Sequence, residues 1–418
     1  MKKFLKVLGI VLGSIVLLIG AAALFIHLRG IPEYDPPMLK VNVISTPERV
    51  ERGAKLASIL CAECHMDSRT GKLTGIHLAE APPEFGTIYS RNITQDKTHG
   101  IGDWSDAAIV GLLRTGITRE GRFIPMMGGY SMMSDEDVHS IFAWLRSSDP
   151  RVAASAVPDR QSDWSFLAKV LGHFVFLPKD LPNGPITTPD INDKVAHGKY
   201  LATAVVGCYT CHSADFKTMN TDEPEKSERF FGGGNEMRDL DGRVIRTSNI
   251  TPDVATGIGS WTEAQFIRAM RDGFRPDNTP IRYPMGRFNH FSDQELSTIY
   301  AYMKTVPAIA FNVPRDDRFA SMRASASHAS KDGKAIFTKY ACYACHGEDG
   351  KGNCDLRDAH KKYGSDSMLV AWIRNPSSIQ ADTKMPTWEG VIAEDEYAPL
   401  AKYVRDLGMR KETIVATK

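Results

Sequence analysis

The sequence lacks the short motifs that mark several large enzyme classes. It contains no GxxxxGK[ST] phosphate loop, no GxGxxG dinucleotide turn, no GxSxG nucleophile turn and no HExxH metal motif. The formal charges nearly cancel, at 51 basic and 50 acidic residues, so no net field attracts nucleic acid. Seven cysteines in 418 residues are too few for a disulfide-stapled secreted domain.

Acidic residues are also missing from the first thirty positions, where three lysines precede an apolar run from Val7 to Leu28. At a rise of about 1.5 Å per residue, this run spans the roughly 30 Å hydrocarbon core of a bilayer. The basic flank places the N-terminus in the cytoplasm and the rest of the chain across the membrane. We expect residues 1–30 to be a retained anchor. A signal peptide cleaved near Ala21–Ala23 is the alternative, and it exports the same globular part.

What the chain does contain is a long-range repeat. The first copy carries CAECH, RNIT, GIGDW, RTG and a methionine before a serine-capped helix, and the second carries CYTCH, SNIT, GIGSW, RDG and a similar methionine. Asn92 to Trp104 and Asn249 to Trp261 are both twelve residues apart. A third, shorter module has CYACH and KMPTW but no NIT or GIGxW. Two domains of one kind therefore stand in tandem before a diverged third.

Helical patterns surround these motifs. Apolar residues recur at helical spacing from Val138 to Leu145 and from Leu296 to Met303, and each CxxCH motif follows another helical stretch. Continuous alternation typical of strands is scarce. We therefore expect a mainly α protein, with an anchor at 1–30 and domains at 47–150, 191–310 and 329–412. The segment 147–190 is too apolar for a free tether and should pack on a domain.

The cysteine pairs point to covalent haem. CxxC alone suits a redox dithiol or half of a zinc site, but a histidine directly after the second cysteine is the c-type haem attachment signature. Two thiols on one helical face form thioethers to the haem, and the next imidazole binds iron. Chance predicts roughly 0.003 such motifs in this composition, and there are three. The predicted attachment and proximal-ligand residues are Cys61, Cys64, His65, Cys208, Cys211, His212, Cys342, Cys345 and His346.

A methionine follows each motif at a distance that suits a second axial ligand. We predict Met127, Met285 and Met385 for this role, with Met126 competing with its neighbour Met127. Thioether sulfur stabilises ferrous iron, so His/Met ligation raises the reduction potential. Three haems closed in this way exchange electrons and not ligands. Cys354, the odd cysteine, is expected to be a buried thiol.

The order of these motifs resembles the tri-haem cytochrome c subunit of bacterial membrane-bound dehydrogenases, the alcohol and gluconate dehydrogenase complexes among them. The resemblance implies three class I cytochrome c domains. It also implies electron transfer on the periplasmic face of the inner membrane, from a quinoprotein or flavoprotein dehydrogenase partner toward quinone or a terminal oxidase. The haem surroundings would then include Asn92, Trp104 and Arg114 and their counterparts Asn249, Trp261 and Arg271, with arginine serving haem propionates. Gly128 and Gly286 depart from the family, which usually has proline after the methionine.

Three functions fit these features. The first is a non-catalytic electron-transfer subunit, which closed ligation favours. The second is a haem enzyme, a peroxidase or a sulfur-compound oxidoreductase, which needs one open iron site and an acid–base group nearby. The third is a redox or gas sensor, although no signalling module follows the haems. Carbon monoxide binding by the reduced protein separates the first from the second.

Overall fold

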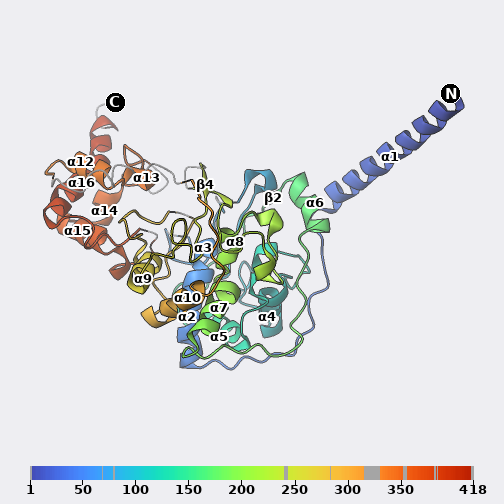
Figure 1. Cartoon of the computed structure of the whole chain (residues 1–418), viewed down its shortest axis with the longest axis horizontal. Coiled ribbons are helices and arrows are strands. Elements are labelled where there is room, and N and C mark those ends of the chain that lie inside the picture. The colour runs from blue at the N-terminus through green and yellow to red at the C-terminus, as the bar shows by residue number, and fades with distance from the viewer. Residues whose placement is uncertain are drawn as a thin grey trace. The chain divides into compact units, whose positions relative to one another are not determined.

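The computed structural model is mainly helical and contains only two small antiparallel sheets in the part that it describes. It describes residues 2–67, 69–78, 81–239, 243–282, 284–314, 330–351, 355–380, 383 and 385–415. The chain divides into two compact units, the first formed by Met1–Ala57 and Cys64–Thr188 and the second by Ser58–Glu63 and Pro189–Lys418. Figure 1 shows the elements of both units along the chain. Cys354, predicted to be a buried thiol, lies outside the described residues.

The elements up to Thr188 begin with a helix that is long and apolar enough to cross a membrane. This helix, α1, covers the apolar run of the sequence. Short 3-10 helices, and one π-helix (η3), carry the label η. The elements are α1 (Lys2–Arg29), α2 (Pro47–Leu60), α3 (Ala62–His65), η1 (Pro83–Phe85), β1 (Gly86–Thr87), α4 (Asp106–Thr115), η2 (Pro125–Tyr130), α5 (Asp135–Leu145), β2 (Asp163–Trp164) and α6 (Phe166–Phe174).

The second unit has the same order of helices around its first CxxCH motif, one before it, one at it and two after it, and then adds further helices. Its elements from Lys194 are α7 (Lys194–Lys199), η3 (Tyr200–Val205), α8 (Cys208–His212), η4 (Phe216–Thr218), η5 (Pro224–Lys226), β3 (Glu236–Arg238), β4 (Val244–Arg246), α9 (Glu263–Asp272) and α10 (Asp293–Met303). They are followed by α12 (Gly333–Lys339), α13 (Tyr343–His346), α14 (Ala359–Lys362), α15 (Asp366–Arg374), η7 (Pro376–Ser378), η8 (Glu394–Glu396) and α16 (Tyr397–Val415).

The helix that precedes each CxxCH motif crosses a later helix at a glycine. A Cβ on Gly53 of α2 would lie 1.9 Å from the carbonyl oxygen of Ser140 on α5, and one on Gly198 of α7 would lie 1.8 Å from that of Thr298 on α10. In the last module, a Cβ on Gly333 of α12 would lie 2.3 Å from the carbonyl oxygen of Pro399 on α16. No larger residue fits so close a backbone contact. A close backbone contact between helices at a glycine therefore recurs three times.

Side-chain caps start the long helices where the sequence indicates. Ser292 and Glu295 form a reciprocal capping box at α10, as the sequence predicts, and Thr262 and Gln265 form another at α9. Ser134 caps α5 by accepting from the Asp137 N–H, and the Asp137 carboxylate accepts from the Arg52 guanidinium at 2.8 Å.

The segment 147–190 packs on the first unit, as its apolar content predicts. Its strand β2 pairs with β1 in antiparallel register, Gly86 opposite Trp164. The earlier segment that follows α1 is also fixed to this unit, because the Tyr34 N–H donates to the Gly121 carbonyl oxygen at 2.8 Å. Both segments therefore belong to the folded body and are not free linkers.

A buried carboxylate lies at the base of the last module. Glu396 is fully buried and accepts hydrogen bonds from the Tyr340 hydroxyl at 2.6 Å, the Lys339 ammonium at 3.0 Å and the Ser330 N–H at 2.9 Å. Burial by itself would raise the pKa of Glu396, but these hydrogen bonds outweigh it and the net pKa is lowered. The ionised form is therefore the one that stabilises the fold.

We expect Glu396→Gln to lower the free energy of unfolding by about 3 kcal/mol at neutral pH, because a neutral amide replaces the carboxylate that balances the largely buried Lys339 ammonium. The folded pKa lies below the unfolded one, so the stability that the carboxylate contributes is present above the unfolded pKa and is lost as pH falls through the folded value. Calorimetry of the full chain should show wild type and variant converging in acid. Glu394→Gln, on the same turn but 77% exposed and paired with Arg374, is the control and should cost under about 1 kcal/mol. Equal effects of the two variants would contradict this assignment.

Candidate functional site

The histidines of the first two CxxCH motifs are held in the same way. His65 ends α3 and His212 ends α8, and each is 8% exposed. The Nδ1 atom of His65 lies 2.7 Å from the carbonyl oxygen of Arg91, and that of His212 lies 2.7 Å from the carbonyl oxygen of Ser248. A carbonyl oxygen only accepts, so Nδ1 carries the proton and the Nε2 lone pair is left for a metal. Burial lowers the pKa of both imidazoles, which favours this neutral form.

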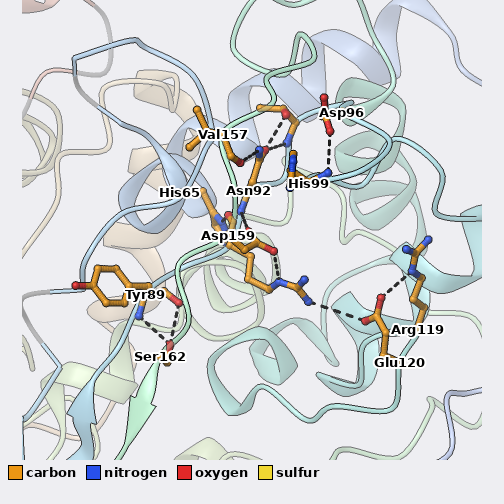
Figure 2. Close-up of polar contacts among 12 residues, drawn as sticks. His65, Tyr89, Asn92, Asp96, His99, Arg119, Glu120, Val157, Asp159 and Ser162 are labelled. Atoms are coloured by element: carbon orange, nitrogen blue, oxygen red, sulfur yellow. Dashed lines mark hydrogen bonds and ion pairs between the residues drawn. The ribbon is translucent and has the colours of Figure 1, made fainter.

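The two carbonyl oxygens occupy equivalent places in the repeat, because Arg91 and Ser248 each precede the asparagine of the NIT motif. In the first copy the Asn92 N–H and the Arg91 guanidinium both donate to Asp159, each at 2.7 Å (Figure 2). The Asn92 amide also donates to the Ser155 and Val157 carbonyl oxygens at 2.9 Å. The asparagine thus fixes the backbone segment that orients His65.

The second copy uses the same device with a different partner segment. The Asn249 amide oxygen accepts from the Thr251 N–H and hydroxyl, and its NH₂ donates to the Ile309 carbonyl oxygen at 2.7 Å. The resemblance implied a place for these asparagines in the haem surroundings. The structure shows that they act on the backbone beside the histidine.

Three of the six thiols have raised pKa values. Burial raises the pKa of Cys208 and of Cys342 to about 12 and also raises that of Cys211. A reactive CxxC pair has a lowered pKa instead. No cluster of three or more His, Cys, Asp or Glu side chains that would hold a metal ion occurs among the described residues. The donor set of two thiols and an adjacent imidazole fits covalent haem.

The third motif is placed by α13, which ends at His346. His346 is half-buried and Cys345 is exposed, in contrast to the buried histidines of the other two motifs. Met385 packs at the edge of the core of this module, in which Trp388, Tyr340 and Tyr397 are buried.

The loop with Met127 distinguishes the two competing methionines. Met127 lies in η2 and is half-buried, whereas Met126 is 54% exposed and Met132 is 51% exposed. Met133 is fully buried in the core. A residue that binds an enclosed iron has to be turned inward, so these exposures favour Met127 over Met126.

Arg114 fastens the end of this methionine loop. Only 4% exposed, it donates to the carbonyl oxygens of Ser131, at 3.2 Å, and of Met133, and pairs with Asp135. Its counterpart Arg271 is 40% exposed and pairs with Asp272 and Asp293. The contacts of both arginines lie within the loop and helix next to the methionine, and their role toward haem propionates stays a prediction.

The two tryptophans of the GIGxW motifs also have structural contacts. Trp104 is buried, and the Arg119 guanidinium lies 5.2 Å from its ring centroid. Trp261 is half-buried, and its carbonyl oxygen accepts from the Tyr300 hydroxyl at 2.7 Å.

A further arginine near the methionines was not identified by comparing the two sequence copies. It is Arg287, which lies two residues after Met285. Its Nη1 donates to the Ser377 hydroxyl at 3.0 Å and its Nη2 donates to the Thr383 carbonyl oxygen, two residues before Met385. The loops of the two methionines are thus joined within the second unit. The Phe274 ring packs against Trp388 in the core of the last module, at 5.1 Å between centroids.

The Nε of Arg287 is buried and has no hydrogen-bond partner among the described residues, and the same is true of Arg229 Nε. Burial lowers the pKa of Arg287 to about 10. A guanidinium is a natural partner for a carboxylate, so orphaned donors here fit a haem, which carries two propionates.

Two family models match parts of this chain. Residues 330–408 match the family model of cytochrome c, and residues 48–145 match that of cytochrome c oxidase, cbb3-type, subunit III. The chain carries cytochrome c domains. Such domains imply covalently bound haem c.

Similar chains are named as subunits of dehydrogenases. The cytochrome c subunit of alcohol dehydrogenase (quinone) from Gluconacetobacter polyoxogenes is 30% identical over 72% of this chain and 66% of its own length. The fructose dehydrogenase cytochrome subunit of Gluconobacter japonicus is 29% identical over 73% of this chain and 65% of its own. The gluconate 2-dehydrogenase cytochrome c subunit of Pantoea cypripedii is 29% identical over 72% and 69%. The chain spans just under two thirds of the first two relatives.

Proposed function

We propose that this chain is a membrane-anchored, tri-haem cytochrome c that transfers electrons at the periplasmic face of a bacterial inner membrane. In this role it is the non-catalytic subunit that takes electrons from a dehydrogenase partner and delivers them toward quinone or a terminal oxidase. The observation that carries the proposal is the repeated histidine geometry, with Nδ1 of His65 and of His212 bound to a backbone carbonyl and Nε2 left for iron.

Each haem is assigned its own module. The cysteine pairs Cys61/Cys64, Cys208/Cys211 and Cys342/Cys345 attach the haems, and His65, His212 and His346 are the proximal ligands. The distal ligands are Met127, Met285 and Met385. The glycine-crossed helix pairs support three modules, because each pair encloses one CxxCH motif in the sequence. Bound haem c supplies reversible one-electron exchange between ferric and ferrous iron.

The protein's own part is to close and connect the sites. His65 and His212 are buried and the three methionines are half-buried, which suits closed iron sites that exchange electrons and do not bind substrate. The Arg287 bridge joins the loops of Met285 and Met385, which supports transfer between the second and third haems. The named relatives support a dehydrogenase as the donor.

The test is purification of the full chain from native membranes in mild detergent. Co-elution of a large quinoprotein or flavoprotein, identified by mass spectrometry, is the expected result. The reduced complex is expected to show no change in its visible spectrum with carbon monoxide, because every iron is six-coordinate. Carbon monoxide binding in the wild-type chain would instead identify an open site and a haem enzyme, a peroxidase or a sulfur-compound oxidoreductase.

A further inference from the structure

An exposed apolar surface follows β2. Helix α6 and the residues after it expose large side chains, with Phe174 70%, Val175 60% and Leu177 55% exposed, and Phe166 and Leu167 each 46% exposed. The sixteen residues 164–179 contain no acidic residue and two lysines, Lys169 and Lys179. We call the five exposed apolar residues the α6 patch.

The opposite side of α6 is covered by the chain that leaves α1. Ala168 and Gly172, one turn apart, are buried. A Cβ on Gly172 would lie 3.3 Å from Cδ of Pro32, and the His173 Nε2 lies 3.1 Å from the carbonyl oxygen of Gly30. Helices α1 and α6 are in contact, and Figure 1 shows α6 beside the C-terminal end of α1.

These contacts fix the depth of the α6 patch. The apolar run of α1 ends at Leu28, so Gly30–Pro32 is where a spanning helix leaves the hydrocarbon core. A helix packed on these residues lies within about one helix diameter, roughly 10 Å, of that level. Large apolar side chains with lysines and no acids are typical of a segment that lies in a lipid interface.

We propose that the α6 patch lies in the outer-leaflet interface of the bilayer, as a second, monotopic membrane contact of this chain. The occupant is phospholipid, with the apolar side chains at the boundary of headgroups and acyl chains and the lysines among the headgroups. This inference rests on the proposed anchoring role of α1. Because the α6 patch lies next to the residues at which α1 leaves the bilayer, phospholipid can contact it without an additional protein.

Contacts to the body of the first unit make α6 a rigid support. The Ser165 hydroxyl caps α6 by accepting from the Ala168 N–H, and it donates to the Glu84 carbonyl oxygen at 2.6 Å. The ring of Phe176 packs on Phe85 at 6.4 Å between centroids. A bilayer contact at α6 therefore fixes the orientation of the first unit, which a single helix would leave free to rotate.

The test uses the full chain in liposomes of phosphatidylcholine and phosphatidylglycerol that contain a phospholipid with a diazirine on its upper acyl chain. After photolysis, peptide mass spectrometry is expected to find lipid adducts in α1 and in residues 166–177. The double variant Phe174→Asp with Leu177→Asp is expected to lower labelling of residues 166–177 about tenfold while labelling of α1 persists. Val254→Asp, at a residue that is 71% exposed on the second unit, is the matched control and should leave both signals unchanged.

The outcomes separate this inference from the proposal on which it rests. Adducts in α1 with none in residues 166–177 of the wild-type chain would overturn the α6 contact and keep the anchor. Adducts in neither segment would overturn both. A second experiment would use native membranes and chemical cross-linking of the chain. If residues 166–177 were cross-linked there to another polypeptide and not to lipid, the α6 contact would be overturned and the surface would belong to a protein partner. The wild-type result decides the question even if the double variant fails to fold, which its haem spectrum would reveal.

Discussion

Replacing Cys208 and Cys211 together by alanine is expected to reduce the haem content of the chain to about two thirds of the wild-type value, because the thioethers that retain one haem are lost. The loss should also destabilise the second unit, since the two half-buried thiols would no longer hold the proposed haem against it. Intact-chain mass spectrometry and the pyridine haemochrome spectrum measure the haem per chain.

The chain offers a matched control for this experiment. Cys354 has no CxxCH context, and Cys354→Ala is expected to leave the haem content unchanged. The corresponding double variants at Cys61/Cys64 and Cys342/Cys345 should each likewise lack one haem. Full haem content in any of the three double variants would contradict the assignment of one haem to that motif.

Replacing Met127 by leucine is expected to open the sixth position of the first haem. Leucine has a similar size but no sulfur, so the iron loses the ligand that favours its ferrous state. The midpoint potential of that haem should fall within the roughly 0.8 V range that axial ligands span, and the reduced protein should gain carbon monoxide binding. Visible spectroscopy and a redox titration measure both effects.

Met126 provides the comparison, because it is the adjacent residue of the same type and is 54% exposed. Met126→Leu is expected to leave the spectrum and the potential as they are in the wild type. If Met126→Leu changes the spectrum and the potential while Met127→Leu leaves both unchanged, Met126 is the ligand. An unchanged spectrum in Met127→Leu alone would refute the assignment.

Residue spacing was enough to predict that the chain carries cytochrome c domains. The three CxxCH motifs need only local geometry, because the two thiols and the imidazole lie within five consecutive residues. The start of a helix also depends on neighbouring residues only, as the capping box of Ser292 and Glu295 shows. The cytochrome c family models match residues within two of the three modules predicted from the motifs.

Other parts of the site depend on residues that are far apart in the chain. Asp159 binds the Arg91–Asn92 backbone region across 67 positions, and no local pattern identifies it. Arg287 has no arginine counterpart in the first copy, where Gly129 follows the methionine by two residues, so the repeat gave no signal for it. The glycines at the helix crossings were visible in the sequence, but a glycine alone does not say which backbone approaches it.

The sequence by itself determined the number of CxxCH motifs, the mainly helical fold, the apolar N-terminal helix and the candidate ligands, because each depends on residue type and on spacing along one element. Tertiary structure decided which nitrogen of His65 and His212 is free, because that depends on a carbonyl oxygen brought from a distant loop. It also decided that Met127 is half-buried and Met126 exposed, and that α6 lies against the exit of α1. These three features result from packing between segments that are distant in the sequence. Packing determines how buried a side chain is, whereas the sequence determines only its chemical type.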